Sequence, residues 1–293
     1  MNKLYDDKYF QKYQKYKEKY INLKAGAMLL HHEKIMPGLS YGTAQGNSSS
    51  IKKNIKLALE NGYKHIDIKQ RYASMLRVSE STYLKYIKEA IEESYIPREE
   101  LWITWHGFSN IEEIIEQLNC QYIDTVIVNN NIDYLIEKKE EGLIKNIAVE
   151  NIYNFEKIKE LHELYKINTL QIQAHIKNDE LIQQCNEIGI KVQLYGINSA
   201  LTNLEEYPSE TDDYYYLMKY ITIYYMLKFL STGNVIIVGS YSGSSIPINI
   251  KNYQDILNGT FDKSTVDIEK IERLLLEIGN ELPDMGFGTL YKK

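Results

Sequence analysis

The sequence alternates between short runs that favour β-strands and longer segments with helical periodicity, and this alternation repeats eight times. The strand-like runs are LSYG from Leu39, KHID from Lys64, LWITW from Leu101, IDTVIV from Ile123, IKNIAV from Ile144, TLQIQ from Thr169, IKVQLY from Ile190 and VIIV from Val235. Between them lie segments such as IKKNIKLALENG and DELIQQCNEIG, whose apolar residues recur at helical spacing. Since strict alternation produces a parallel sheet and eight units suffice to close it, we predict an α/β protein with a (β/α)8 TIM barrel.

An open, doubly wound sheet is the alternative to a barrel. It is disfavoured because no G-x-G-x-x-G motif follows LSYG, where a dinucleotide-binding sheet of that kind requires one. Gly62 and Gly189 stand where a helical segment gives way to a strand, as glycine caps do. The 293 residues are 44% hydrophobic and contain no Gly/Ser-rich linker. We therefore predict one barrel domain over residues 35–293, preceded by a helical extension over residues 1–34.

The ends of the predicted strands carry a ring of polar and aromatic side chains. In the stretch GYKHIDIKQRY, Asp67 and Tyr72 follow a hydrophobic strand, at the end of the barrel where functional groups gather. The other strand ends carry Gly42 and Thr43, His106, Asn129, Glu150 and Asn151, Gln171, Tyr195, and Gly239 with Ser240. Such a ring would suit a flat polar heterocycle, although an Asp and a Tyr in one turn also have a purely structural explanation.

Seven of these segments, in order, resemble the aldo-keto reductase family. GYKHIDIKQRY resembles the family's G-Y-R-H-I-D-T-A-x-x-Y motif, EGLIKNIAVEN resembles G-K-V-R-A-I-G-V-S-N, and LQIQAH resembles N-Q-I-E-Y-H. MPGLSYGT, REELWIT, QYIDTVIV and VQLYG are similar to the first, third, fourth and seventh strands of the family. The likeness runs from Met36 to the C-terminal helix.

The resemblance implies reduction of an aldehyde or ketone with NADPH or NADH. It implies that Tyr72 donates the proton and that Asp67 is its buried charged partner. It also implies cofactor contacts: Asn151 and Gln171 would hold the nicotinamide carboxamide, Tyr195 would stack on its ring, and Gly42, Thr43, Gly239, Ser240 and Asn249 would complete the cofactor groove. The loop GSYSGSS offers backbone N–H groups to a phosphate.

Two of the four catalytic positions depart from the family pattern. Where the family has a lysine, this chain has His106, and where it has a histidine, this chain has Asn129. A lysine beside a phenol lowers the pKa of the phenol, and a neutral imidazole does so poorly, whereas an amide still donates a hydrogen bond to a carbonyl oxygen. Glu150 replaces a serine, and Ser244 and Ser245 stand where an arginine for the 2′-phosphate is expected.

These departures leave two functions open. One is an NAD(P)H-dependent carbonyl reductase with a degenerate catalytic tetrad and weak activity. The other is a catalytically inactive barrel, a pseudoenzyme, that binds a nucleotide or serves in an assembly. His106 is equally consistent with packing in an aromatic cluster and with a catalytic substitute. The remaining histidines show no metal-ligand spacing, so no metal is expected.

The first 24 residues hold seven Lys and three acidic residues, with Tyr9, Tyr13, Tyr16 and Tyr20 along one helical face. This charge of +4 leaves the rest of the chain at −10, because the whole chain carries −6. The extension either docks on the acidic body or captures a protein partner, and its composition resembles leaders on some proteins of large DNA viruses. The acidic body argues against nucleic-acid binding.

No signal peptide is recognised, and the two cysteines suggest a reducing compartment. The apolar stretch from Tyr214 to Leu230 contains two lysines and is interpreted as a buried helix, not a membrane span. We therefore expect a cytoplasmic location, in a host cytoplasm or virion if the chain is viral.

Overall fold

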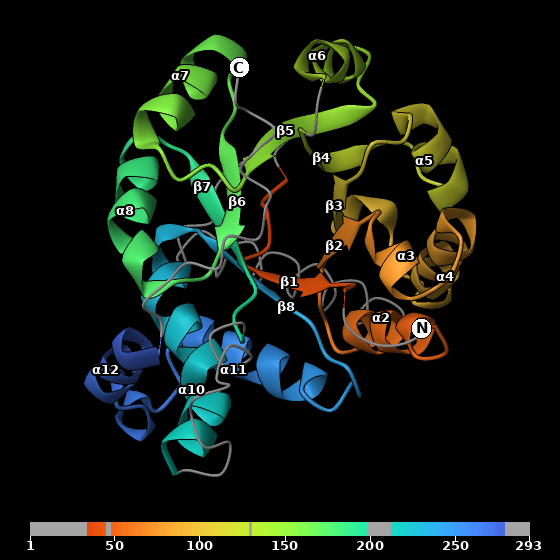
Figure 1. Ribbon diagram of the computed structural model, residues 1–293. Coiled ribbons are helices and arrows are strands. Elements are labelled where there is room, and N and C mark those ends of the chain that lie inside the picture. The colour runs from red at the N-terminus through yellow and green to blue at the C-terminus, as the bar shows by residue number, and fades with distance from the viewer. Residues whose placement is uncertain (1–33, 45–47, 129–130, 199–211, 279–293) are drawn as a thin grey trace, which may run out of the picture.

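Eight parallel strands form a closed barrel in the computed structural model, which describes residues 34–44, 48–128, 131–198 and 212–278. The strands follow one another around the barrel in sequence order, and β1 pairs with β8 to close it (Figure 1). They are β1 (Leu39–Gly42), β2 (His65–Lys69), β3 (Trp102–His106), β4 (Ile123–Ile127), β5 (Ile144–Glu150), β6 (Thr169–Gln173), β7 (Lys191–Tyr195) and β8 (Val235–Val238). Every strand predicted from the sequence is present, so the predicted barrel is confirmed.

Helices surround the barrel and bury the outward faces of its strands (Figure 1). They are α2 (Ile51–Glu60), α3 (Tyr72–Met75), α4 (Glu80–Glu93), α5 (Ile111–Leu118), α6 (Ile132–Glu140), α7 (Phe155–Tyr165), α8 (Asp179–Glu187), α10 (Asp212–Phe229), α11 (Ile246–Asn258) and α12 (Ile268–Ile278). Gly62 and Gly189 follow α2 and α8 with φ of 102° and 85°, in the left-handed region where a side chain would be strained. Both predicted caps are therefore confirmed.

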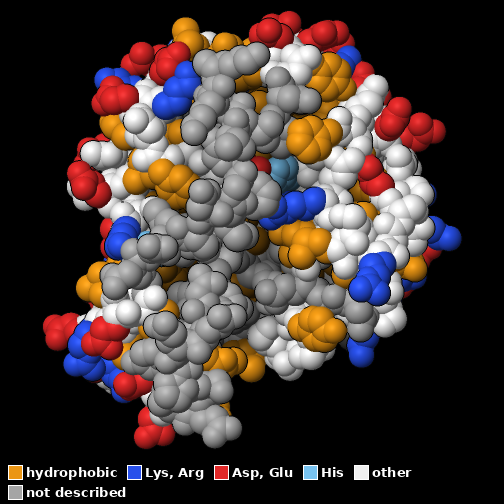
Figure 2. Space-filling view, in the orientation of Figure 1, with side chains coloured by type: hydrophobic (Ala, Val, Ile, Leu, Met, Phe, Trp, Pro, Cys, Tyr) orange, Lys and Arg blue, Asp and Glu red, His pale blue; other side chains and the backbone are white. Residues whose placement is uncertain are grey.

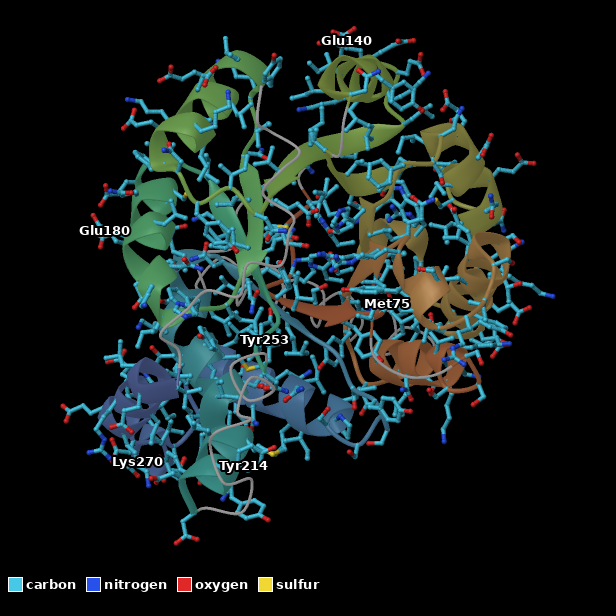
Figure 3. All side chains as sticks on the ribbon, viewed as in Figure 1. Met75, Glu140, Glu180, Tyr214, Tyr253 and Lys270 are labelled. Atoms are coloured by element: carbon cyan, nitrogen blue, oxygen red, sulfur yellow. The ribbon has the colours of Figure 1, made fainter. Side chains whose placement is uncertain are left out.

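Alternate residues of each strand face the helices or the barrel interior, because side chains alternate along a strand. The helix-facing positions are apolar, as Ile66, Ile68 and Ile103 illustrate, and all three are fully buried. The interior is largely polar and internally hydrogen-bonded. Trp102 Nε1 donates to Thr125 Oγ1 and Gln171 Nε2 donates to Gln193 Oε1. Figure 3 shows this interior filled with side chains, so the barrel is a packed core.

An ion cluster seals the N-terminal end of the barrel. Asp124, 2% exposed, lies 2.6 Å from Lys34 Nζ and 2.7 Å from Arg98 Nη2, and it accepts the backbone N–H of Ile103. These contacts join the chain before β1 to β3 and β4. Residues 1–33, which include the tyrosine stripe of the predicted extension, lie outside the described residues.

Candidate active site

The end of β2 and the start of α3 bring three ionisable groups to the C-terminal mouth of the barrel. Asp67 and Lys69 are two residues apart in a strand and therefore face the same side, the barrel interior. Asp67 is 2% exposed and Lys69 only 1%. Tyr72 opens the four-residue helix α3 directly after the strand, and its side chain is 9% exposed. A carboxylate, an ammonium and a phenol thus share one largely dehydrated region.

Asp67 is held by an amide from the far side of the barrel. Gln171 Nε2 donates to Asp67 Oδ1 at 2.9 Å and to Gln193 Oε1 at 3.0 Å. Burial raises the pKa of Asp67, while the charge of Lys69 and this hydrogen bond oppose that increase. Gln171 Oε1 is buried and has no hydrogen-bond partner among the described residues. The same side chain therefore anchors Asp67 and presents an unused acceptor.

Glu150, at the end of β5, contacts side chains from β2 and β3. His106 Nε2 lies 2.7 Å from Glu150 Oε1, and Lys69 Nζ lies 3.4 Å from Glu150 Oε2. Burial alone would raise the pKa of Glu150, but the hydrogen bond from His106 and the charge of Lys69 hold it below its ordinary value. An ionised carboxylate only accepts hydrogen bonds, so His106 Nε2 carries the hydrogen. His106 Nδ1 is buried and unpartnered within the described structure.

Tyr72 is set up to keep its proton at neutral pH. Burial and then the charge of Asp67 raise the pKa of Tyr72 to about 12, against the charge of Arg71 and a hydrogen bond from its side chain. Arg71 Cζ lies 5.5 Å from the centre of the Tyr72 ring. The phenol is therefore an acid at physiological pH, which suits a proton donor.

Asn151 and Tyr195 lie together on the opposite side of the mouth. The Tyr195 hydroxyl donates to Asn151 Oδ1 at 2.8 Å. Asn151 has a φ of 52°, so the chain turns sharply at the end of β5. The Lys69 ammonium lies 4.3 Å from the centre of the Tyr195 ring, a cation–π distance. Lys69 thus reaches across the mouth from β2 to β7.

The ends of β1 and β8 contribute backbone more than free side chains. Gly42 pairs with Asp67, and the buried Thr43 hydroxyl donates to the Asp67 carbonyl at 3.0 Å. Ser240 Oγ accepts the N–H of Gly243, and Gly239 precedes it directly after β8. Asn249 lies in the early turns of α11, half-buried. The Thr43 and Ser240 hydroxyls are therefore already used inside the protein.

The structure thus brings most of the predicted residues into one connected set: Asp67, Tyr72, His106, Asn151, Gln171 and Tyr195. Asn129 lies outside the described residues. Sequence analysis missed Lys69, although its spacing of two residues from Asp67 in a strand was a usable signal. It also noted Glu150 only as a nearby charge, not as the link between His106 and Lys69.

Figure 2 shows basic, acidic and histidine side chains close together near the centre of this face. In the described part of the chain, no three or more His, Cys, Asp or Glu residues are placed to hold a metal ion. None of the described helices, α10 included, has the length and apolar character needed to cross a membrane.

No family model matches the chain. Among curated proteins, it is 25% identical over 229 residues to aldo-keto reductase family 1 member A1 of Cricetulus griseus, covering 64% of this chain and 69% of that protein. It is 26% identical over 264 residues to the NAD/NADP-dependent indole-3-acetaldehyde reductase of Schizosaccharomyces pombe, covering 77% and 83%. The aldose reductase structure from Giardia lamblia superposes with a TM-score of 0.65 at 19% identity, covering 82% of this chain and 92% of that one. The structural match establishes a common barrel, and the sequence matches show that this chain is similar to aldo-keto reductases.

Proposed function

We propose that the protein reduces an aldehyde or ketone to an alcohol with a nicotinamide cofactor. The observation that carries this proposal is the bonding of Gln171. Its Nε2 anchors Asp67, beside the proton donor Tyr72, while its Oε1 is a buried acceptor without a partner. An unpaired buried acceptor costs free energy unless a ligand supplies a donor, and the amide N–H of a carboxamide is such a donor.

The residues present fit a nicotinamide at the mouth. Gln171 Oε1 would accept from the carboxamide, Asn151 lies on the adjacent strand end, and the Tyr195 ring offers a stacking face. When bound, this group supplies a hydride to the carbonyl carbon. Lys69 already lies over the Tyr195 ring. The cofactor ring therefore has to share that side chain with the ammonium or displace it.

The chain's own residues would handle the proton. Tyr72 Oη transfers its proton to the carbonyl oxygen as the hydride arrives, and solvent then restores the phenol. Asp67 holds the surrounding cations in place. Burial disfavours the ionised form of Asp67, so the negative charge of Asp67 depends on Lys69 and on the hydrogen bond from the Gln171 amide. His106, fixed by Glu150, faces the same region with Nδ1 unpaired.

The residues expected at the adenosine end of the cofactor site do not favour NADPH over NADH. The usual partner for a 2′-phosphate is arginine, and none occurs from Val235 through Asn258, the region of β8 and α11. Gly239, Ser240 and Asn249 would face the adenosine end. We therefore propose that NADH and NADPH bind with dissociation constants within about tenfold of each other, because the discriminating charge pair is missing.

Large apolar side chains surround the mouth. Met75 on α3, labelled in Figure 3, is exposed, as are Phe108 after β3 and Tyr153 after β5. Each follows the C-terminal end of a strand. This rim favours an apolar carbonyl compound, such as an aromatic aldehyde, over a small charged one.

The test has two stages. Titration with NADPH and NADH, followed by cofactor fluorescence, measures binding. Aldehyde-dependent loss of absorbance of the reduced cofactor then measures turnover, with Tyr72→Phe as the variant. We expect both cofactors to bind, and we expect Tyr72→Phe to lower kcat by about 100- to 10,000-fold with little change in cofactor affinity, since it removes only the transferable proton.

Binding without turnover on a broad aldehyde panel would reject the reductase and favour the inactive nucleotide-binding barrel. Failure to bind either cofactor would reject both and leave an assembly role. The matched control is Tyr63→Phe. Tyr63 is another buried tyrosine, and it precedes β2 at the opposite end from Tyr72.

A further inference from the structure

Three departures from the family pattern contact one another at the mouth. Lys69 occupies the alanine position of the G-Y-R-H-I-D-T-A motif, His106 the lysine position and Glu150 the serine position. Glu150 bonds both of the others, through Oε2 to Lys69 and through Oε1 to His106. Lys69 and His106 are also direct register partners on the adjacent strands β2 and β3. The substitutions therefore form one physical unit.

We propose that Lys69, on β2, supplies the positive charge that the family pattern places on the adjacent strand β3, at position 106. Lys69 is then a positioning residue for the proton transfer from Tyr72, and it acts through the carboxylates of Asp67 and Glu150. The inference rests on the proposed reductase function.

The charges at the mouth make such a cation necessary. Asp67 and Glu150 are the described carboxylates whose charges act on the Tyr72 phenol, and both raise its pKa. The same two carboxylates act on Lys69. Lys69 and Arg71 supply two positive charges against these two carboxylates. Without Lys69, one of these positive charges is lost beside a phenol that becomes phenolate as it gives up its proton.

The buried location of Lys69 also indicates that its ion pair is not an incidental surface contact. Burying an ammonium costs several kcal/mol unless it is paired and held by further contacts. Lys69 meets a carboxylate on β5 and an aromatic face on β7, on the far side of the mouth from β2. A helix-facing lysine could have reached solvent at no such cost.

The Lys69 ammonium also predicts how activity depends on pH. The groups that face it or act on it are Asp67 and Arg71 from its own segment, His106 from β3, Glu150 from β5 and Tyr195 from β7. Burial lowers the pKa of Lys69, with the charges of Glu150 and Asp67 in opposition. Since the charged form is the active one, activity should fall as the pH rises through this lowered pKa, well before Tyr72 ionises.

The experiment compares kcat, KM and the pH profile in four variants. Lys69→Met should lower kcat by about 100- to 1,000-fold, the range for loss of a positioned charge, while cofactor affinity stays within a few-fold. Lys69→Arg should be at least tenfold faster than Lys69→Met, with its alkaline limb moved to higher pH, because arginine stays charged. The double variant Lys69→Ala/His106→Lys moves the charge to β3 and should recover most of the lost rate. Lys228→Met removes a partnered lysine on α10 and should leave kcat unchanged.

The outcomes separate the two proposals. No turnover by the wild type overturns both of them. Wild-type turnover together with a Lys69→Met rate within about threefold of it, and an unchanged pH profile, overturns only the role of Lys69. A double variant that stays folded and binds cofactor but is as slow as Lys69→Met also overturns that role.

Discussion

His65, Asp67 and Lys69 occupy successive inward positions of β2, and their protonation changes from the core to the mouth. His65, the deepest, is completely buried, and one ring nitrogen lies 2.9 Å from Thr104 Oγ1 while the other faces the Pro37 carbonyl. Burial lowers its pKa to about 3. The same strand face therefore holds a neutral imidazole below and two ionisable groups of opposite sign above, where polar partners from other strands oppose the effect of burial.

This imidazole predicts a loss of stability in acid that begins near pH 6.5, above the ordinary pKa of the carboxylates at the mouth. Above pH 6.5 His65 is neutral in both the folded and unfolded states and contributes no pH dependence. As the pH falls from 6.5 toward 3, the unfolded state binds a proton that the folded state refuses, so stability is lost. The loss reaches about 4 to 5 kcal/mol at the lower limit, and about 2 to 3 kcal/mol at pH 4.5.

Urea unfolding at pH 7 and pH 4.5 measures the effect. His65→Gln should be less stable than the wild type at pH 7, because Thr104 loses its partner, but should lose about 2 to 3 kcal/mol less between the two pH values. His162→Gln, on the outer helix α7, provides the matched control. Equal losses in His65→Gln and the wild type would contradict the prediction.

At the scale of elements, strand and helix boundaries follow local chemistry, and so they were accessible from sequence. The strands carry apolar residues on the face toward the helices, as Ile66 and Ile68 of β2 illustrate, and Gly62 and Gly189 end the preceding helices. Two other helices end at residues whose backbone conformation is strained. Asn119 and Lys166 close α5 and α7 in the left-handed conformation without being glycine. Such a residue carries a backbone cost of about 1 to 2 kcal/mol, lower for Asn than for Lys.

Lys166→Gly should therefore stabilise the protein by about 0.5 to 1 kcal/mol, because relief of strain exceeds the extra entropy of glycine in the unfolded chain. Lys159→Gly makes the same chemical change at an exposed position inside α7 and should cost about 1 kcal/mol. Unfolding midpoints in urea distinguish them. If both variants lose stability, the strain assigned to the α7 terminus is not there.

At the scale of the whole molecule, closing the barrel creates contacts that no local pattern encodes. Asp67 and Tyr72 are neighbours in sequence, and their placement was predicted from one motif. Lys69, His106 and Glu150 belong to three strands, and the link between them needs β2, β3 and β5 to meet at one mouth. Pairwise spacing cannot reveal such a set. A strand-face analysis would have shown that Lys69 points inward but not what it meets.

The two ends of the closed barrel also have different roles. The mouth carries the candidate chemistry, whereas the Asp124 cluster at the other end joins Lys34, Arg98 and the start of β3. In barrels of this type, the N-terminal end contributes stability and the C-terminal end function. Asp124→Asn keeps the shape of the side chain but leaves two cations, each 18% exposed, without their negative partner.

We expect Asp124→Asn to lower the free energy of unfolding by about 3 kcal/mol, the lower part of the range for breaking a buried pair, since both cations retain some contact with water. At temperatures where the variant is folded, cofactor affinity and kcat should match the wild type, because no residue of the mouth is touched. Thermal unfolding and the aldehyde assay, run on the same samples, measure the two quantities. Glu150→Gln supplies the mirror image: it weakens the contacts that hold Lys69 and His106 at the mouth, so it should reduce kcat while leaving the cluster at the other end intact. A drop in kcat for Asp124→Asn as large as that for Glu150→Gln would show that the two ends are coupled through the barrel and are not separate.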